Sequence, residues 1–537
     1  MTRRIIVTTA LCYSNGPLHL GHILEQTQAD IWVRYLKQKG HQCIFLSGED
    51  AHGTPIMVAA KKQGLDVENY IASIAESHLS DIKGFQINYD YYHSTHSDEN
   101  KELCEDIFDR IQPHIEKRTI EQFFDVHEKM FLPDRFIKGT CPKCGAKEQY
   151  GDSCEVCGAF YQPTQLIDPH STLTNTTPEI RKTDHLFFKL SELQPFICKW
   201  LEESNIQDAA KNKLSEWTSE TLHDWDITRD APYFGFLIPG YKDKYFYVWM
   251  DAPIGYIAAL KAYCSTRDEL NIEDLWWENT QSEIYHFVGK DIMYFHGVFW
   301  PAVLKAANIQ TPTSLFTHGF LTINKEKMSK SKGTFISAAK YLETYPSDAL
   351  RYYFASKLND QIQDIDINWE DFAQKVNSDI VGKIVNIGSR CSKIIINHFD
   401  GNIKSNFEDS LPENKDLLIA LEELITQVDD AYHQRKFSIV VKLISTFADH
   451  TNQFIADHAP WKLVKENQMD RAHSLCSMGL FAFAQIIALL YPVTPTLAKN
   501  TFSYLGLPIT WRVAFPDYFS ISSFPRLFER IDADAIS

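Results

Sequence analysis

Residues 4–46 have the sequence RIIVTTALCYSNGPLHLGHILEQTQADIWVRYLKQKGHQCIFL, in which a helix-like segment separates two strand-like ones. The β-branched segment 4–10 predicts a strand that ends before the turn SNGP at 14–17. Apolar residues then recur at helical spacing over residues 18–39, and residues 43–46, CIFL, predict a short buried strand. Strand, helix and strand in this order indicate an α/β fold with a parallel, doubly wound, Rossmann-like sheet.

The whole chain has 537 residues, which is enough for about three or four domains. Its hydrophobic fraction of 44% and charged fraction of 23% exclude a disordered or collagen-like protein. Fifty-three basic residues against 70 acidic ones give a net charge of −17, which argues against a histone-like protein that coats nucleic acid. Local basic patches can still bind RNA or DNA.

The N-terminus shows no hydrophobic region typical of a signal peptide. The apolar stretch at 479–491 is too short to span a membrane and instead predicts a buried helix. We therefore expect a cytoplasmic protein without a membrane partner.

Strand-like segments return at 245–249, 283–288 and 315–318, after a region with a different, cysteine- and glycine-rich character. Beyond residue 375 the pattern is helical, with segments at 380–396, 415–430, 437–458 and 472–490 that predict an all-α bundle. We therefore expect a sheet domain in two halves at 1–114 and 232–322, an insertion at 115–231, a connecting region at 323–374 and a helical domain at 375–537.

Four of the eleven cysteines form two C-x2-C pairs, each followed by glycine, at Cys141, Cys144, Cys154 and Cys157. Four thiolates at this spacing suit one structural Zn²⁺ in a closed tetrahedral site. A redox disulfide pair is an alternative, and a catalytic zinc is a weaker one because no open coordination position is evident. Since no export signal is present, the cysteines indicate a reducing compartment rather than a disulfide framework.

His19 and His22 lie three residues apart at the start of the first predicted helix, with Gly21 between them. In an open parallel sheet this turn lies at the carboxyl edge, where ligands bind, and a helix start attracts phosphate. The arrangement suits stabilisation of a pentacoordinate phosphate by positioned donors. Two surface histidines on an amphipathic helix are the alternative. The P-loop and dinucleotide-binding motifs are absent from the sequence.

Residues 325–333, KEKMSKSKG, carry four lysines and one glutamate in an otherwise acidic chain. Small residues and a terminal glycine predict a mobile loop, whose Lys327 and Lys330 could neutralise a pyrophosphate leaving group. A solvated lysine loop is the alternative.

HLGH at 19–22 together with KMSKS at 327–331 resembles the paired signature of the class I aminoacyl-tRNA synthetases. The stretches EDAHGTP at 49–55, YFYVWMDAPIGY at 245–256 and GKDIMYFH at 289–296 are similar to the methionyl-tRNA synthetases within that class. This resemblance covers essentially the whole chain. It departs at Cys12, where the family usually has proline, which leaves the backbone less constrained and puts a thiol near the predicted amino-acid pocket.

The resemblance implies a ligase that converts methionine and Mg-ATP to methionyl-adenylate and pyrophosphate, and then charges the 3′ end of initiator and elongator tRNA(Met). It implies catalytic roles for His19, His22, Lys327 and Lys330, and ATP contacts from His19, Gly21, His22, Gly289, Asp291 and Lys330. It implies a methionine pocket of Leu11, Tyr13, Asp50, Trp249, Ala252, Pro253, Tyr256 and His296. Aromatic faces suit a thioether, and Asp50 can pair with the α-ammonium group. Packing in the core is the alternative for Trp249 and Tyr256. The implied cofactors are one structural Zn²⁺ and Mg²⁺ bound with ATP.

The predicted helix over residues 375–393 carries four basic residues and one acidic residue, so it could follow an RNA backbone. Asn386 and Arg390 share one helical face, and Trp461 follows a proline break where a flipped base could stack. By resemblance these three residues read the CAU anticodon, residues 375–537 form the anticodon-binding domain, and residues 323–374 hold the KMSKS loop and stem contacts. Helix packing is the alternative for Trp461. Because the chain shows no added C-terminal dimerising domain, we expect a monomer.

Related class I synthetases are the main alternatives. Enzymes for leucine, isoleucine or valine would need a larger editing insertion, and a cysteine enzyme would place zinc at the amino-acid site. A non-catalytic tRNA-binding protein would be expected to lose the histidines or the lysine loop, and this sequence keeps both.

Overall fold

The structure is a computed structural model that describes residues 2–151, 154, 156–157, 159, 161–277, 280–327 and 335–536. Its centre is a parallel sheet with strand order β15–β14–β1–β3–β4, and β2 pairs with the end of β3. The strands are β1 (Arg4–Thr9), β2 (Cys12–Tyr13), β3 (Gln42–Asp50), β4 (Tyr91–Ser94), β14 (Glu283–Gly289) and β15 (Ser314–His318). The predicted parallel α/β sheet is therefore confirmed.

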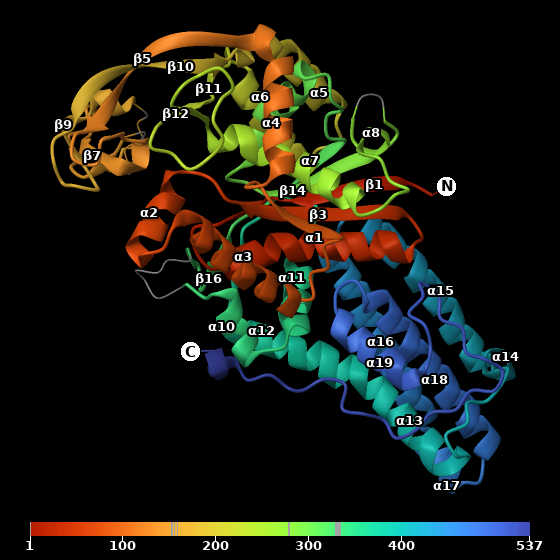
Figure 1. Ribbon diagram of the computed structural model, residues 1–537. Helices are drawn as coiled ribbons and strands as arrows, with labels where there is room; N and C mark the ends of the chain where they lie inside the picture. The colour runs from red at the N-terminus through yellow and green to blue at the C-terminus, as the bar shows by residue number, and fades with distance from the viewer. Residues whose placement is uncertain are drawn as a thin grey trace.

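Helices cover both faces of the sheet (Figure 1). Alternate residues of β1 point to opposite sides, so Ile5 and Val7 join the core beneath α1, and Ile6 joins the core beneath α7. The helices of the sheet domain are α1 (Leu20–Gln38), α2 (Thr54–Gln63), α3 (Val67–Gly84), α4 (Asp98–Arg110), α7 (Val248–Ser265), α8 (Ile272–Leu275), the π-helical η5 (Phe295–Phe299) and α9 (Trp300–Ala306).

The region between β4 and β14 contains an antiparallel sheet whose long pair is β5 (Ile115–Asp125) with β10 (Glu179–Phe188). Beside this pair lie β6 (Met130–Phe131) and β11 (Trp225–Asp226), and the cysteine-rich sheet is formed by β7 (Ile137–Thr140), β8 (Gln149–Tyr150) and β9 (Ile167–Ser171). Helices α5 (Gln194–Glu203) and α6 (Asp208–Thr218) share a hydrophobic core with α7 and the parallel sheet. Short 3₁₀ turns are η1 (Gln112–His114), η2 (Asp134–Phe136), η3 (Pro163–Gln165) and η4 (Leu190–Leu193).

The strand expected at 245–249 is wrong in its second half. Strand β13 (Lys244–Phe246) pairs antiparallel with β12 (Thr228–Asp230), outside the parallel sheet, and α7 begins at Val248. Helix α7 is buried almost all round, so its apolar residues show no helical periodicity and resemble a buried strand in the sequence.

Beyond β15 a small sheet joins β16 (Leu321–Ile323), β17 (Glu326–Lys327) and β18 (Ile365–Ile367), with α10 (Ala338–Thr344) and α11 (Ser347–Lys357) between them. The helical domain follows, and the four predicted helical segments are confirmed. Its elements are α12 (Trp369–Val376), the π-helical η6 (Asn377–Val385), α13 (Asn386–Phe399), α14 (Phe407–Ser410), α15 (Pro412–His433), α16 (Phe437–His458), α17 (Pro460–Lys465), α18 (Met469–Leu490), α19 (Pro495–Leu505) and η7 (Ala533–Ile536).

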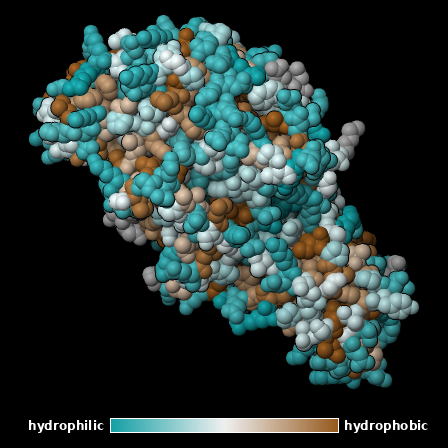
Figure 2. Space-filling model, in the orientation of Figure 1, coloured by the Kyte–Doolittle hydropathy of each residue, from teal (hydrophilic) through white to brown (hydrophobic). Residues whose placement is uncertain are grey.

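Helix α18 is long and apolar enough to cross a membrane by length and composition, but 94% of its most apolar window is buried inside the protein. It is therefore the central helix of the bundle, in contact with α13 and α16 (Figure 1). The face of the molecule seen in Figure 2 is largely hydrophilic, with hydrophobic groups between the polar ones.

Candidate functional site

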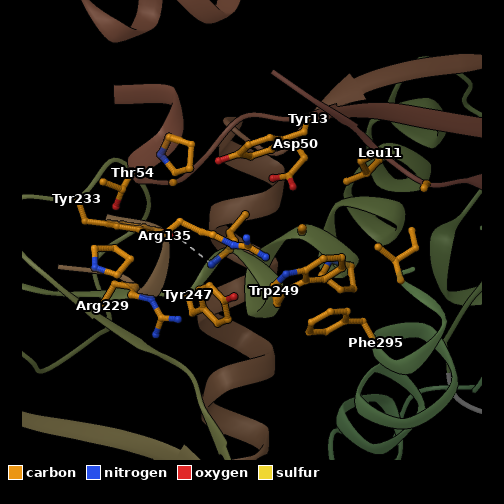
Figure 3. A pocket seen from close by; sticks show the side chains of 18 of the residues that line it. Leu11, Tyr13, Asp50, Thr54, Arg135, Arg229, Tyr233, Tyr247, Trp249 and Phe295 are labelled. Carbon is orange, nitrogen blue, oxygen red and sulfur yellow. Dashed lines mark hydrogen bonds between the residues drawn. The ribbon is translucent and has the colours of Figure 1, made fainter. Parts of the chain in front are cut away.

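A cavity of about 660 Å³ opens at the carboxyl ends of the parallel strands, between the β1–α1 connection, the start of α7 and the insertion. All eight residues predicted for the amino-acid pocket line it, namely Leu11, Tyr13, Asp50, Trp249, Ala252, Pro253, Tyr256 and His296. Figure 3 labels Leu11, Tyr13, Asp50 and Trp249 among them. The structure thus brings together segments that lie up to 285 positions apart between Leu11 and His296.

Asp50 supplies the negative charge of this cavity. It ends β3, and its Oδ1 atom is buried without a hydrogen-bond partner among the described residues. Burial and the nearby Asp251 raise the pKa of Asp50 well above its usual value, although the backbone N–H of His52 opposes this shift. An unpaired buried carboxylate oxygen is suited to a ligand that brings its own positive charge, such as an ammonium group.

Another part of the cavity wall is apolar and neutral. Tyr256 Oη lies 2.8 Å from His296 Nε2, and His296 Nδ1 lies 3.1 Å from the carbonyl oxygen of Ile292. The ring of His296 therefore donates from Nδ1 and accepts from Tyr256 at Nε2, and burial lowers its pKa to about 4. Trp249 stacks on Phe295 with ring centroids 3.6 Å apart. Aromatic faces beside a neutral imidazole suit a polarizable thioether.

Sequence reasoning missed several residues of the cavity wall. Phe295 and Tyr247 lie close to predicted residues in the chain, whereas Arg135, Arg229 and Tyr233 come from the insertion or its border (Figure 3). The two arginines are isolated basic residues with no motif around them, so only the folded chain shows that they reach the cavity. They give the wall two cations that face the same space as Asp50.

His19 and His22 form the amino end of α1 rather than the cavity wall. His19 Nδ1 accepts the N–H of Gly21 at 3.0 Å, and His22 Nδ1 accepts the N–H of His19 at 3.1 Å. Each neutral ring therefore carries its proton on Nε2, and the two rings stack at 3.8 Å. The pKa of His22 lies well below its usual value because of burial and the neighbouring His19 and His78. The turn thus fixes two neutral N–H donors at a helix start, as a phosphate site requires.

The segment that follows the lysine motif packs against this turn. Ser337 bridges to His19, the N–H of Ala338 donates to Leu18 at 2.9 Å, and the ring of Phe335 contacts that of His19. Lys327 ends β17, and Lys330 lies outside the described residues. Residues 335–338, which follow the lysine motif in the chain, therefore lie beside the predicted phosphate site.

Gly289 and Asp291, predicted to contact ATP, lie at the end of β14, which is the neighbour of β1 in the sheet. A Cβ atom on Gly289 would lie 2.5 Å from Asp291 Oδ1, so a larger residue here would displace the side chain of Asp291. The predicted nucleotide contacts therefore lie along one edge of the sheet.

Cys12 is buried behind the cavity and does not line it. Gln26 Nε2 lies 3.1 Å from its sulfur, and burial together with the nearby Glu49 raises the pKa of the thiol. The thiol is therefore protonated and inert at neutral pH.

The four predicted metal ligands come together in the insertion. The sulfur atoms of Cys141, Cys144, Cys154 and Cys157 all lie within 4.8 Å of one another. The Cys144–Cys154 and Cys141–Cys157 pairs are 3.5 and 3.9 Å apart, whereas a tetrahedral Zn²⁺ with Zn–S bonds of about 2.3 Å needs about 3.8 Å. All eleven cysteines are described, and none forms a disulfide. The thiols therefore fit a structural zinc rather than a redox pair.

Two of the three predicted anticodon residues, Arg390 on α13 and Trp461 on α17, lie close together, and Figure 1 shows α17 at the far end of the helical domain. The guanidinium of Arg390 lies 5.1 Å from the ring centroid of Trp461, whose side chain is 38% exposed. Asn386 Nδ2 donates to Asn452 Oδ1 at 3.1 Å. The exposure of Trp461 argues against a purely packing role.

The positive charge expected on the helix over residues 375–393 is partly neutralised by ion pairs. Lys375 lies 2.8 Å from Asp379, and Lys383 lies 2.7 Å from Asp449 on α16. The second pairing joins residues 66 positions apart, so it could not be read from one helix.

A model of the family described as class I tRNA synthetases (M) matches residues 5–392. Among solved structures, the chain is similar to Mycobacterium tuberculosis methionyl-tRNA synthetase in complex with methionyl-adenylate, with a TM-score of 0.80 and 21% identity over 99% of this chain and 100% of that one. A second structure of the Mycobacterium tuberculosis enzyme, bound by methionyl-adenylate, gives a TM-score of 0.80 and 20% identity over 98% of this chain and 100% of that one. At these identities the likeness establishes a shared fold.

Proposed function

Because the chain belongs to the class I tRNA synthetases (M), we propose that it is a methionine–tRNA ligase. It activates methionine with Mg-ATP to methionyl-adenylate, releases pyrophosphate and transfers methionine to the 3′ end of initiator and elongator tRNA(Met). The observation that carries this proposal is the single cavity that joins the Asp50 carboxylate to the Trp249–Phe295 and Tyr256–His296 pairs.

The cavity supports binding of methionine in one orientation. Asp50 accepts hydrogen bonds from the α-ammonium group, and the neutral His296 and the aromatic rings surround the thioether. The methionine carboxylate then lies toward the β1–α1 turn, where the α-phosphate of ATP is held. This orientation directs the carboxylate at phosphorus, and no side-chain nucleophile is needed.

Charge stabilisation at the phosphates is the second part of the mechanism. His19 and His22 donate from Nε2 to phosphate oxygens, and the lysine motif with Lys327 and Lys330 closes over the pyrophosphate. The contact between Phe335 and His19 supports this convergence. In the second step, the terminal ribose hydroxyl of tRNA attacks the adenylate carbonyl and releases AMP.

The insertion and the helical domain support the RNA-dependent step. Cys141, Cys144, Cys154 and Cys157 would hold one Zn²⁺, which supplies rigidity to the insertion and takes no part in the chemistry. Asn386, Arg390 and Trp461 would read the CAU anticodon by hydrogen bonds and stacking.

The protein works as a monomer in the cytoplasm. Every residue proposed for methionine comes from one chain, so the site needs no second copy. Eleven cysteines without a disulfide suit a reducing compartment.

Amino-acid-dependent exchange between ATP and pyrophosphate, measured with each of the twenty amino acids, tests the proposed function. We expect exchange with methionine and no comparable exchange with the others. Preference for another amino acid would reassign the enzyme, and no exchange with any of them would favour a non-catalytic tRNA-binding protein.

A further inference from the structure

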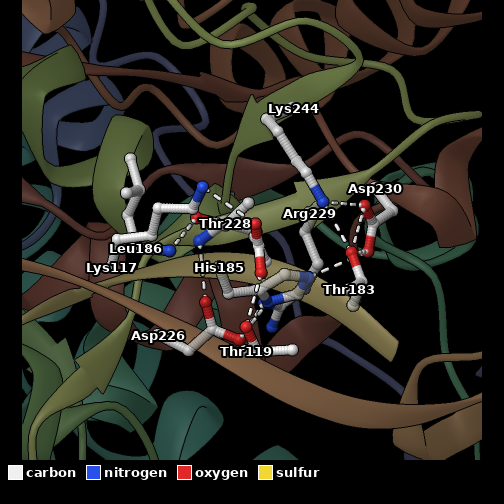
Figure 4. A network of polar contacts seen from close by, with 11 residues as sticks. Lys117, Thr119, Thr183, His185, Leu186, Asp226, Thr228, Arg229, Asp230 and Lys244 are labelled. Carbon is white, nitrogen blue, oxygen red and sulfur yellow. Dashed lines mark hydrogen bonds and ion pairs between the residues drawn. The ribbon is translucent and has the colours of Figure 1, made fainter. Parts of the chain in front are cut away.

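A polar network is buried where the insertion returns to the sheet domain (Figure 4). Its centre is His185 on β10, whose ring is fully buried. His185 Nδ1 lies 2.7 Å from Asp226 Oδ2, and His185 Nε2 lies 2.8 Å from Asp230 Oδ2. One side chain of the insertion thus holds two carboxylates, which lie three residues before and one residue after Arg229 in the chain.

The geometry determines the protonation state of this histidine. Ionised carboxylates only accept hydrogen bonds, so a ring that faces one at each nitrogen must donate from both and is an imidazolium. Burial alone would lower the pKa of His185, but the hydrogen bonds to Asp226 and Asp230 outweigh burial and raise it.

The surrounding charges are nearly balanced. Lys244 on β13 forms an ion pair with Asp230, and Thr183 donates to the same carboxylate at 3.0 Å. Arg229 Nη1 lies 3.6 Å from Asp226. Three cations therefore surround two partly buried aspartates, and loss of the His185 charge would leave Asp226 without its closest partner.

The network is connected to the amino-acid cavity through Arg229. The guanidinium of Arg229 lies 3.6 Å from the ring centroid of Tyr247, and both residues line the cavity. The backbone N–H of Tyr247 donates to the carbonyl of Ile227 at 2.9 Å. Tyr247, whose ring packs against Arg229, is therefore anchored to segment 226–230. The position of Arg229 thus depends on a segment whose carboxylates are held by His185.

We propose that His185 is a positioning residue of the amino-acid cavity, which fixes segment 226–230 through Asp226 and Asp230 and thereby holds Arg229 over Tyr247 in the cavity wall. His185 touches no substrate. The inference rests on the proposed function, because Arg229 lines the cavity that is proposed to bind methionine.

ATP–pyrophosphate exchange by the full-length His185→Gln variant tests the inference. Glutamine is neutral and can donate to only one of the two carboxylates at this position. We expect the KM for methionine to rise about tenfold, with kcat and the KM for ATP changed by less than about twofold. A merely structural defect would lower the concentration of active enzyme and reduce kcat, leaving both KM values unchanged.

A double-mutant cycle with Arg229→Ala shows whether His185 acts through the arginine. In the Arg229→Ala background, His185→Gln should add less than about a twofold change in the KM for methionine. A matched control is His114→Gln, because His114 pairs with Glu192 at 2.9 Å at the edge of the insertion, and we expect it to leave both KM values unchanged. If His185→Gln does not fold, the nearly isosteric Asp226→Asn removes the charge between His185 and Arg229 and should show the same KM effect.

An unchanged KM for methionine in His185→Gln, or an undiminished effect in the Arg229→Ala background, overturns the inference. Wild-type exchange with methionine alongside either result leaves the proposed function intact. Absence of any wild-type exchange overturns both.

Discussion

Substrate binding and burial favour opposite protonation states of Asp50. Binding an ammonium group requires its ionised form, whereas burial and the nearby Asp251 favour the protonated form. Its Oδ1 atom has no partner among the residues that the structure describes. In the free protein the ionised carboxylate of Asp50 is therefore destabilised by burial, and the ammonium group of methionine compensates its charge on binding.

We predict that Asp50→Asn weakens methionine binding and stabilises the fold. A hydrogen bond to a charged group contributes about 1.5–3 kcal/mol, so the KM for methionine should rise about 10- to 150-fold. The unfolding temperature should increase, because the neutral amide removes the buried charge. Exchange kinetics and thermal unfolding measure the two effects. The exposed Asp416→Asn on α15 is the control, and a lower unfolding temperature for Asp50→Asn would contradict the explanation.

The raised pKa of Asp50 also predicts a pH dependence. As the pH falls through this pKa, Asp50 gains a proton and loses its attraction for the ammonium group, so the KM for methionine should rise. This rise should begin well above the usual aspartate range near about pH 4. The free energy of unfolding should change in the opposite direction. Because folding raises the pKa of Asp50, the fold becomes less stable as the pH increases from the pKa of the unfolded chain to that of the folded protein. A KM that stays constant down to about pH 4 would show that Asp50 is not the ammonium partner.

Sequence reasoning identified residues within motifs and missed isolated ones. Asp50, Trp249 and His296 lie in recognisable stretches, and all three line the cavity. Arg135 and Arg229 reach the same cavity from the insertion, where nothing in the local sequence distinguishes them from surface arginines. Their contribution depends on contacts between distant segments, which one sequence does not reveal.

At the scale of elements, the cluster of Cys141, Cys144, Cys154 and Cys157 is a small unit whose structure depends on its four thiols. Backbone N–H groups of Lys143 and Cys157 lie 3.4 Å from the sulfur atoms of Cys141 and Cys154, which orients the ligands. We predict that Cys144→Ala releases about one equivalent of zinc and lowers activity through local misfolding. Metal analysis and exchange kinetics on the same sample measure both.

The matched control for the zinc site is Cys198→Ala, because Cys198 lies on α5 outside the cluster. It should retain zinc and activity. Full activity of a zinc-free Cys144→Ala protein would refute the structural role.

The contact between α13 and α17 presents Arg390 and Trp461 at the surface. Stacking of a base on an aromatic ring contributes about 1–3 kcal/mol, so Trp461→Ala should reduce kcat/KM for tRNA about 5- to 150-fold. Methionine-dependent exchange should stay unchanged, because it needs no tRNA. Tyr518→Ala is a control at a fully exposed aromatic side chain. Equal losses in aminoacylation and exchange would instead indicate a general defect.

Helix α7 shows where periodicity misleads. The apolar run at its start predicted a strand, yet the helix begins at Val248 and is buried on nearly all sides. The amphipathic helices of the C-terminal domain, such as α13 and α16, were predicted well because each has one polar face. Amphipathicity therefore made α13 and α16 predictable, whereas α18 is predicted although nearly all of its residues are buried.

At the scale of the whole molecule, the sheet domain and the helical bundle share one hydrophobic core. A buried ion-pair cluster lies at the same junction. Arg351 on α11 contacts Asp30 on α1 at 2.6 Å and donates to the carbonyl of Pro492 at 2.8 Å. The cluster thus joins the helix that carries His19 and His22 to the loop after α18.

We predict that Arg351→Met lowers the unfolding temperature strongly, because removing one partner of a buried ion pair costs about 3–5 kcal/mol. The exposed pair Arg512–Glu422 is the control, since Arg512→Met should cost less than about 1 kcal/mol. Thermal unfolding of both variants measures the difference. Similar unfolding temperatures for the two variants would show that the junction contributes little.

The shared core has a consequence for synthesis on the ribosome. Helix α1 covers the apolar underside of the sheet, and its own outer face packs on the bundle, where Tyr35 stacks on Tyr432 of α15. In a nascent polypeptide this outer face of α1 is therefore shielded from water only after α15 has emerged. Until then this apolar surface is exposed and can bind chaperones or neighbouring nascent chains.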